Sequence, residues 1–261
     1  MNPDAYLPAL GTALSHLSVQ LADAGQYEEG LAAIEEAVGL YRQLADANPA
    51  VHLPYLAVLL TYLAARLGDL GRREGDLEAV DEAVGLYRQL AGVKAAYLPN
   101  LAVTLTNLAL RLAGLGRAED GLSAIDEAVG LYRELASVNP AAYLPGLALA
   151  LSHFSVLLAA VGRGDEALTA GDEAVGLYRE LAAVNRTAHL PDLAVSLNNL
   201  AVQLGHLGRC EEGLTAIREA ADHYRQLALG DAARFEPHLQ ASLEVAEWLE
   251  SPASSGQQPG H

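Results

Sequence analysis

The sequence predicts an all-α fold: an α-solenoid of five helix-turn-helix repeats followed by one C-terminal capping helix. First, the signature AVGLYR begins at Ala37, Ala83, Ala128 and Ala174, and in weaker form (AADHYR) at Ala220. The spacings are 46, 45, 46 and 46 residues, and a fixed period of about 20–50 residues is typical of repeat architectures. Second, 51% of the residues are hydrophobic but only 5% are aromatic. This composition favours helices packed through small side chains over a β-sandwich.

The recurring unit sets the expected organisation of the chain. Because each unit of such an array contacts only its neighbours, no central core is required. We predict two-helix units at about 3–48, 49–93, 94–139, 140–185 and 186–230, a capping helix at 232–250 and a low-complexity, disordered tail at 251–261.

The first helix of each unit is expected to follow a Leu-Pro pair. Proline suits the first helical turn, where its missing N–H would have no partner. In the first unit Leu10, Leu14, Leu17 and Leu21 then recur at helical spacing. A glycine is expected to end each first helix, because glycine tolerates the left-handed conformation of a tight turn. The five turn glycines are Gly25, Gly71, Gly116, Gly162 and Gly208.

The second helix of each unit is expected to begin directly after the turn. Acidic residues such as Glu28 and Glu29 stand at its start, where they complement the positive end of the helix dipole. Asn48-Pro49 and Asn139-Pro140 are expected to end second helices. One repeat is a residue shorter and lacks the Asn-Pro pair, and we expect this deletion in the loop between Ala91 and Pro99.

These features together resemble the tetratricopeptide repeat. A small residue lies seven positions before each turn glycine, and an alanine lies twelve positions after it. The resemblance covers residues 3–250, although the period of 45–46 exceeds the 34 residues usual in the family, so longer helices are expected. Similar long-period arrays resemble regions of bacterial signalling proteins. The resemblance implies a right-handed solenoid whose first helices line a concave groove that binds a protein or peptide ligand. Asp76 stands where a small residue is expected and Gly171 where a bulky one is expected.

Candidate binding residues follow from this resemblance. Tetratricopeptide grooves often hold a peptide main chain with an asparagine nine positions before the turn glycine, and Asn107 and Asn199 match it. An amide both donates and accepts, so it can pair with an extended backbone. The alternative is a polar surface ladder that binds no ligand. The predicted groove residues are Tyr62, Arg66, Thr106, Asn107, Leu110, Leu149, His153, Val156, Leu157, Asn198 and Asn199.

The predicted groove has an apolar centre. Ala160 stands where the first two repeats carry Asp23 and Asp69, and Leu157 replaces a polar residue of other repeats. We therefore expect an apolar patch around Leu149, Val156 and Leu157. Because most acidic residues lie on second helices, the groove is expected to be nearly neutral and the opposite face negative.

Composition disfavours some partners. The net charge is −17, which repels phosphate, so neither nucleic acid nor an anionic membrane surface is an expected partner. The segment from Leu144 to Gly162 has no formally charged residue over 19 positions, close to the roughly 20 residues of a membrane span. However, it lies in register with charged sister segments, which favours a repeat helix.

The compartment is inferred from the cysteine content and the N-terminus. Cys210 is the single cysteine, so no intrachain disulfide framework exists. The start of the sequence lacks the basic and apolar regions of a signal peptide. We therefore expect a cytoplasmic protein.

No motif predicts catalytic, cofactor-binding or metal-binding residues. A phosphate-binding glycine loop and paired-cysteine zinc spacing are both missing from the sequence. His206 and Cys210 flank the last turn but have no further ligands nearby in sequence. Acidic pairs such as Asp126-Glu127 recur in successive repeats, which indicates a solvated helix face rather than a catalytic pair.

The sequence therefore favours a non-enzymatic protein- or peptide-binding scaffold or regulatory module. One alternative is a homo-oligomerisation module, with a weak homodimer formed through the apolar N-terminal helix. A second is a fragment of a larger signalling protein, whose missing part covers that helix. An enzyme acting on a small molecule inside the superhelix is the least favoured.

Overall fold

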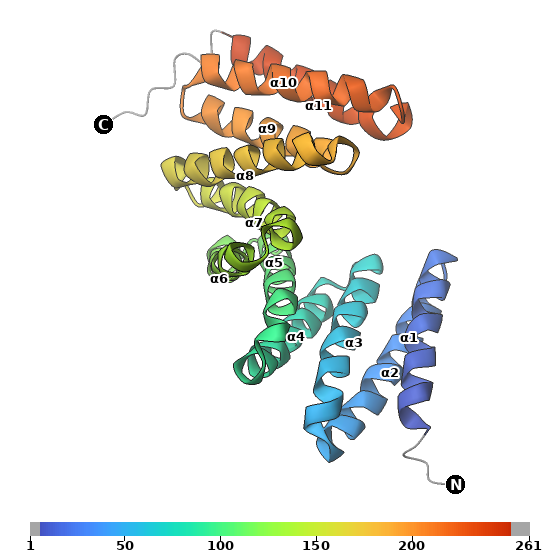
Figure 1. Ribbon diagram of the computed structural model, residues 1–261. Helices are drawn as coiled ribbons and strands as arrows, with labels where there is room; N and C mark the ends of the chain where they lie inside the picture. Colours follow the sequence, from blue (N-terminus) through green and yellow to red (C-terminus); the bar gives the residue numbers. More distant parts are fainter. Residues whose placement is uncertain (1–5, 252–261) are drawn as a thin grey trace. The chain divides into compact units, whose positions relative to one another are not determined.

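The structure is a computed structural model that describes residues 6–251, and all regular elements in this range are helical. The predicted all-α fold of helical repeats is confirmed. The chain divides into two compact units, Met1–Leu131 and Tyr132–His261, and the boundary falls inside helix α6 (Ala118–Val138) (Figure 1). The predicted tail at 251–261 lies outside the described residues except for Ser251.

The first unit holds the first two repeats and part of the third. From α1 to α5 each α-helix packs against the next one along the chain, and α1 also contacts α3. Its helices are α1 (Leu7–Asp23), α2 (Tyr27–Ala47), α3 (Pro49–Asp69), α4 (Arg73–Val93), the short 3-10 helix η2 (Ala95–Tyr97), α5 (Leu98–Gly114) and the start of α6.

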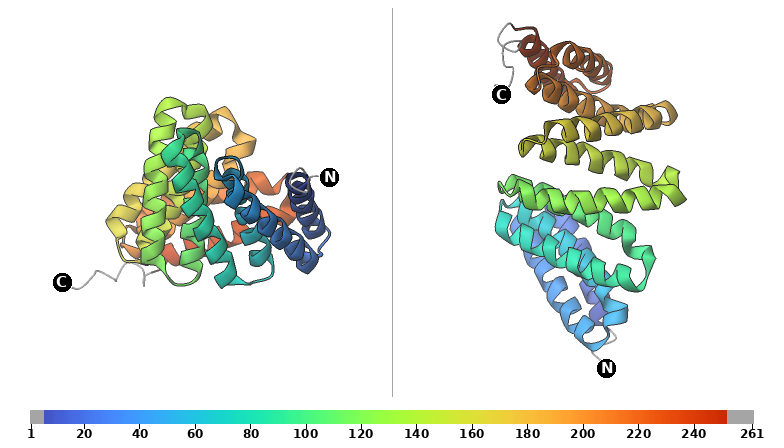
Figure 2. Two further views of the ribbon diagram at one scale, coloured as in Figure 1. Left: turned by 90° about the horizontal axis from the view of Figure 1, so that it is seen from below. Right: turned by 90° about the vertical axis from the view of Figure 1, so that its left-hand side faces the viewer.

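The second unit holds the end of α6, two further repeats and the last helix. Successive helices from α7 to α11 pack in order, and α9 also contacts α7 and α11. The views in Figure 2 show successive helices joined by tight turns. The helices are α7 (Pro140–Ala160), α8 (Gly164–Val184), α9 (Arg186–His206), α10 (Cys210–Ala228) and α11 (Ala232–Glu250).

Each repeat turns at a glycine with left-handed backbone. At the five predicted turn glycines φ lies between 69° and 81°, a range that residues with a side chain seldom adopt. In the first repeat the Gly25 N–H donates to the Ala22 carbonyl at 2.9 Å, and the Gln26 N–H donates to the Leu21 carbonyl at 2.8 Å. Such paired bonds satisfy the last carbonyls of a helix. The predicted role of these glycines is confirmed.

Small residues lie where the two helices of a repeat meet. The alanine twelve positions after each turn glycine has no exposed surface, and the small residue seven positions before it is at most 1% exposed. These positions allow the close helix approach that the sequence predicts. The alanines are Ala37, Ala83, Ala128, Ala174 and Ala220.

The prediction that each first helix begins at its Leu-Pro pair holds for α1 and α5 and is wrong for α3, α7 and α9. These three helices begin four residues before the leucine of that pair, directly after an asparagine. The side-chain oxygen of Asn139 accepts from the Ala142 N–H at 3.3 Å, which caps the helix. A proline within the second turn removes only one helical hydrogen bond. The hydrogen bonds of the additional first turn outweigh that loss. The internal prolines are Pro54, Pro145 and Pro191.

The shortened repeat lacks this asparagine start. Its residue Lys94 ends α4, and η2 leads into α5 at Leu98. The missing residue therefore lies between two helices, as predicted, and neither helical apolar face is rotated.

The two unusual residues noted in the sequence each have a partner. Asp76 is buried and its carboxylate accepts from the Arg111 guanidinium, so a charge on α5 compensates the charge on α4. Gly171 leaves room for Gln203 and Ser155, because a Cβ there would lie 3.3 Å from the side-chain oxygen of each. The Gln203 Nε2 donates to Ser155 Oγ at 2.8 Å.

Second helices are joined by ion pairs between successive repeats. In the first unit Arg42 pairs with Glu82 at 2.6 Å, and Arg88 pairs with Glu127 at 2.5 Å. The second unit continues the pattern between Arg133 and Glu173 and between Arg179 and Glu219. These pairs explain why the arginine that ends the AVGLYR signature recurs with the repeat.

Two helices of the described chain, α3 and α7, are long and apolar enough to cross a membrane by length and composition. The helix α7 contains most of the segment singled out in the sequence. Both are first helices of repeats that pack on their neighbours, and buried helices of other folds meet the same two criteria. No group of three or more histidine, cysteine, aspartate or glutamate side chains that could hold a metal lies within residues 6–251.

Candidate functional site

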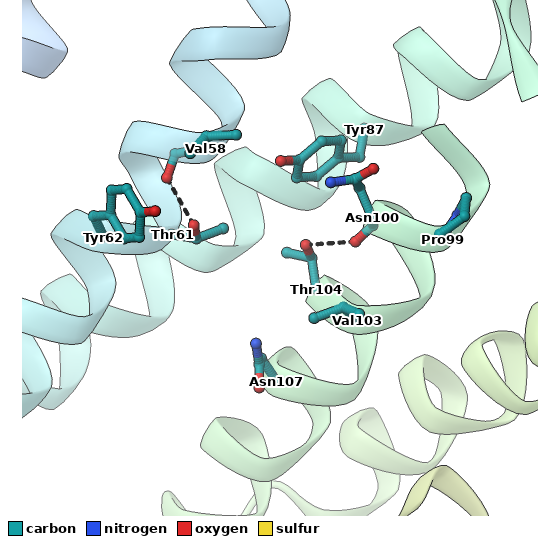
Figure 3. A pocket seen from close by; sticks show the side chains of 9 residues that line it. All are labelled: Val58, Thr61, Tyr62, Tyr87, Pro99, Asn100, Val103, Thr104 and Asn107. Carbon is teal, nitrogen blue, oxygen red and sulfur yellow. Dashed lines mark hydrogen bonds between the residues drawn. The ribbon is translucent and has the colours of Figure 1, made fainter. Parts of the chain in front are cut away.

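A pocket of about 320 Å³ opens between the first helices α3 and α5 of the first unit, with α4 behind it. Figure 3 shows its side chains converging on this space. Two of the predicted groove residues, Tyr62 and Asn107, take part. The lining residues are Val58, Thr61, Tyr62, Tyr87, Pro99, Asn100, Val103, Thr104 and Asn107.

The two threonine hydroxyl groups of the pocket are occupied within their own helices. Thr61 Oγ1 donates to the Val58 carbonyl at 2.7 Å, and Thr104 Oγ1 donates to the Asn100 carbonyl at 2.8 Å. Both bonds are drawn in Figure 3. These threonines therefore present mainly their methyl groups to a ligand.

The Asn107 amide is a polar group of the pocket that remains available. Its side chain forms no hydrogen bond with any residue in the described range, and only its backbone carbonyl accepts a long contact of 3.4 Å from Arg111. In Figure 3 the amide points into the space between α3 and α5. An amide held on a rigid helix with both its donor and its acceptor unused can bind a peptide group.

The remaining walls are aromatic and aliphatic, and no lining residue carries a formal charge. Burial raises the pKa of the Tyr87 phenol above its ordinary value, and a hydrogen bond to the Asn100 side chain opposes this rise. Tyr87 is therefore neutral at physiological pH. Tyr62 stands at the mouth with 44% of its surface exposed. The pocket is suited to an uncharged group in spite of the acidic composition of the chain.

The other predicted residues of the first unit have different positions. Leu110 is exposed on α5, and the Arg66 Nε lies 3.1 Å from the Asp69 carboxylate. The prediction for Thr106 is wrong: it is buried, and its hydroxyl donates to the Ala102 carbonyl at 2.9 Å. At this position, ten before the turn glycine, the side chain is buried and cannot contact a ligand.

Sequence reasoning missed several lining residues of this pocket. Val58 precedes Tyr62 by four residues and Val103 precedes Asn107 by four, so the helical period alone places each pair on one face. Asn100 precedes Asn107 by seven residues and so shares its face, whereas Tyr87 carried no such signal, because it stands on the second helix α4.

The second unit has a similar pocket of about 330 Å³ between α7 and α9. Predicted residues Val156 and Asn199 line it, and Leu149 is exposed about two turns before Val156 on α7. As with Asn107, no hydrogen bond within the described range engages the Asn199 side chain. Burial lowers the pKa of the partly buried His153, so its imidazole is neutral at pH 7.

Two predictions for the second unit need correction or refinement. Leu157 is only 3% exposed, so it belongs to the core and not to an apolar binding patch. Asn198 contacts the last helix, because its side-chain oxygen accepts from the Ser242 hydroxyl at 2.9 Å. The apolar patch predicted around Leu149, Val156 and Leu157 therefore reduces to the first two residues.

Comparison with known proteins gives the family context. The family model described as Anaphase-promoting complex subunit 5 matches residues 5–66, 92–144, 144–190 and 182–228, which together span more than half of the chain. No match to a curated protein was found.

Solved structures of repeat proteins have a similar fold. A Podosopora anserina protein with nearly identical TPR-like repeats, described as a kinesin light chain, has a TM-score of 0.65 at 15% identity, covering 85% of this chain and 97% of its own. YrrB, a TPR protein with an unusual peptide-binding site, has a TM-score of 0.53 at 15% identity over 90% of each chain. Aspartyl phosphate phosphatase F from Bacillus subtilis has a TM-score of 0.55 at 13% identity, covering 96% of this chain and 62% of its own. At these identities the likeness concerns the fold alone.

Proposed function

Because the chain belongs to the tetratricopeptide-like repeat family whose model is described as Anaphase-promoting complex subunit 5, we propose that it is a non-enzymatic scaffold that binds an extended segment of another protein on its first helices. Folds of this kind generally serve protein–protein interaction. YrrB is described as having a peptide-binding site of its own, which supports looking for one here.

The observation that carries this proposal is the unused amide of Asn107 beside an uncharged pocket. An extended peptide exposes one N–H and one C=O per residue, and these match the acceptor and donors of a side-chain amide. The pocket beside it, about 320 Å³, then receives a neutral side chain of the bound segment. In the second unit Asn199 has the same position in the repeat and the same unused amide.

A catalytic role has less support. The ionisable groups that line the pocket of the first unit are two tyrosines, and burial raises the pKa of Tyr87 further from physiological pH. A general acid or base works best with a pKa near the operating pH. On the basis of the charge of −17, we also propose partners other than nucleic acid or a membrane surface. A cytoplasmic location is proposed from the single cysteine, Cys210.

The proposal is tested by selecting peptides from a random display library on the full chain and measuring their affinities for variants. We expect Asn107→Ala to weaken selected peptides about tenfold, since an amide that loses two hydrogen bonds forfeits about 1–3 kcal/mol.

Asn48→Ala is the matched control in the same unit. Asn48 is exposed and its side chain makes no capping hydrogen bond, so its removal should leave affinity unchanged. If the two variants bind selected peptides equally well, the main chain is not held by Asn107. If no peptide is selected above background, the chain is not a peptide-binding scaffold.

A specific observation also favours self-association through α1. Leu10 and Leu17 lie seven residues apart on one face of this helix and are 45% and 44% exposed, and burying an aliphatic side chain yields about 1.5–3 kcal/mol. Two residues on each of two chains approach the association cost of about 4–15 kcal/mol, so we propose a weak, concentration-dependent homodimer. Sedimentation at rising concentration tests this proposal, with Leu17→Glu as the variant that should stay monomeric. A wild-type chain that also stays monomeric contradicts the proposed homodimer.

A further inference from the structure

We propose that the pocket between α7 and α9 of the second unit selects an uncharged aliphatic side chain, of about leucine size, from a bound protein segment. This inference deepens the proposed function, on which it rests, by naming what the second unit recognises. It is argued from the walls, the floor and the charges of that pocket.

The walls are aliphatic. Helix α7 contributes Val156, Ala159 and Ala160, and α9 contributes Val202. Val156 remains 43% exposed, so its methyl groups are available for contact. The two small alanines leave a space of about 330 Å³, which accommodates a branched aliphatic side chain.

The floor and one end of the pocket are fixed by contacts within the unit. Gln203 is only 6% exposed, and its Nε2 donates to Ser155 Oγ at 2.8 Å. His206 packs against the Trp248 ring of α11 with centroids 5.2 Å apart. Because these side chains are already held, a ligand does not have to order them, and less binding free energy is lost.

The distribution of charge excludes ionised side chains. Two positions before the turn glycine the first two repeats carry Asp23 and Asp69, whereas this repeat has Ala160. No carboxylate lines the pocket, so a lysine or arginine would lose hydration without gaining an opposite charge. An aspartate or glutamate would in addition be repelled by a chain of net charge −17.

A main-chain anchor lies beside this space. The Asn199 side chain lines the pocket and has no hydrogen-bond partner in the described part of the chain. A segment that places an aliphatic side chain against Val156 and Val202 thus brings its adjoining peptide groups to the Asn199 amide. The pocket and the amide together specify a short extended segment with one aliphatic residue.

The test uses N-acetyl-leucine methylamide, which has one aliphatic side chain between two peptide groups, and the corresponding aspartate and lysine compounds. Binding to the isotope-labelled full chain is followed by NMR through the side-chain amide signals of Asn199 and Asn107. We expect the leucine compound to shift the Asn199 signals with a dissociation constant of about 1 mM, as is usual for a ligand of this size. The aspartate and lysine compounds should bind at least about tenfold more weakly.

Ala160→Asp is the decisive variant, since it installs the residue that two other repeats carry at this exposed position and should not disturb folding. It should weaken the leucine compound about tenfold and strengthen the lysine compound. Gly114→Asp is the control. Gly114 has the same position in another repeat, is exposed, and has no atom within 4 Å of its Cβ position. It should leave binding at Asn199 unchanged.

Each other result decides against this inference. Equal binding of the three compounds to the wild-type chain, or no effect of Ala160→Asp, would show that the pocket does not select an aliphatic group. Shifts confined to Asn107 would overturn it while leaving the proposed function intact. If none of the three compounds binds, the inference about this pocket is wrong as well. The proposed function is tested separately, by the selection of peptides from the library.

Discussion

Gly205 lies on α9 where α11 packs closely against it, and the packing requires a residue without a side chain at this position. A Cβ at this position would lie 2.4 Å from two atoms of the Trp248 ring and 2.5 Å from a Leu249 methyl carbon. These distances are far below van der Waals contact, so the Trp248 ring and the Leu249 side chain cannot both keep their positions. Gly205→Ala therefore disrupts the packing of α11 on α9. Gly176 is the matched control in the same unit, because it lies inside α8 and no atom stands within 4 Å of its Cβ position.

The two substitutions are expected to change stability in opposite directions. Alanine in place of a glycine inside a helix gains about 1 kcal/mol, and Gly176→Ala should show this gain in full. At Gly205 the same gain is offset by overpacking, which costs about 1–3 kcal/mol. Three clashing atoms place Gly205→Ala at the upper end of that range, so we expect a net loss of about 2 kcal/mol. The two variants should then differ by about 3 kcal/mol.

Urea unfolding is the assay, followed both by circular dichroism and by fluorescence. Trp248 is the single tryptophan of the chain, so fluorescence reports on the α9–α11 contact while circular dichroism reports on the whole helical array. Gly205→Ala should shift the tryptophan emission to the red and lower the fluorescence midpoint more than the dichroism midpoint. If Gly205→Ala stabilises the chain as much as Gly176→Ala, with unchanged emission, α11 does not pack on α9 as described.

Three further predictions concern polar groups. The pair of Arg88 with Glu127, both side chains more than a third exposed, should show a coupling of about 0.2–1 kcal/mol in a double-mutant cycle that declines in 1 M salt; a coupling above 2 kcal/mol would contradict this. Ser155→Ala should cost about 1–3 kcal/mol, because it leaves the buried Gln203 amide unpaired, and the double variant with Gln203→Leu should recover most of this loss in urea unfolding. Burial lowers the pKa of His153 in the folded chain, so protonation favours the unfolded state and stability should fall as the pH drops below about 6.5. His153→Asn introduces the asparagine that two other repeats have at this position, and it should reduce the pH dependence of stability. If stability varies with pH as steeply as in the wild type, the dependence comes from other groups.

The repeat itself was predictable because its determinants are local. A glycine needed at positive φ, a small residue at each helix crossing and an apolar period of 3.6 are all visible in the sequence, and five copies confirm one another. The starts of the first helices were not equally visible. Pro54 reads as a helix start by its own preference, whereas Asn48-Pro49 reads as a stop. The end of one helix and the beginning of the next fall on the same two residues.

The candidate site was predictable in part, where the direction of a side chain follows from its place on the helix. The position nine before the turn glycine faces the pockets, and Tyr62, Asn107 and Asn199 line them. The neighbouring position lies at the edge of that face. There Thr61 lines a pocket, but Thr106 is buried, and Asn198 bonds to Ser242. For a residue at such an edge, exposure depends on the distance between two first helices. That distance cannot be read from the sequence of one helix.

The position five before the turn glycine shows where this kind of prediction ends. Backbone register places the Cβ of this residue equivalently in each repeat, yet Arg66 lies near Asp69 on its own helix, while Arg111 reaches Asp76 on α4. Leu157 enters the core, and Gln203 is buried against Ser155 in the space left by Gly171. The polar side chains differ because each pairs with a different group, and for Arg111 and Gln203 that group stands on another helix. A repeat alignment therefore fixes where a side chain begins, whereas its contacts depend on pairs of substitutions such as Asp76 with Arg111.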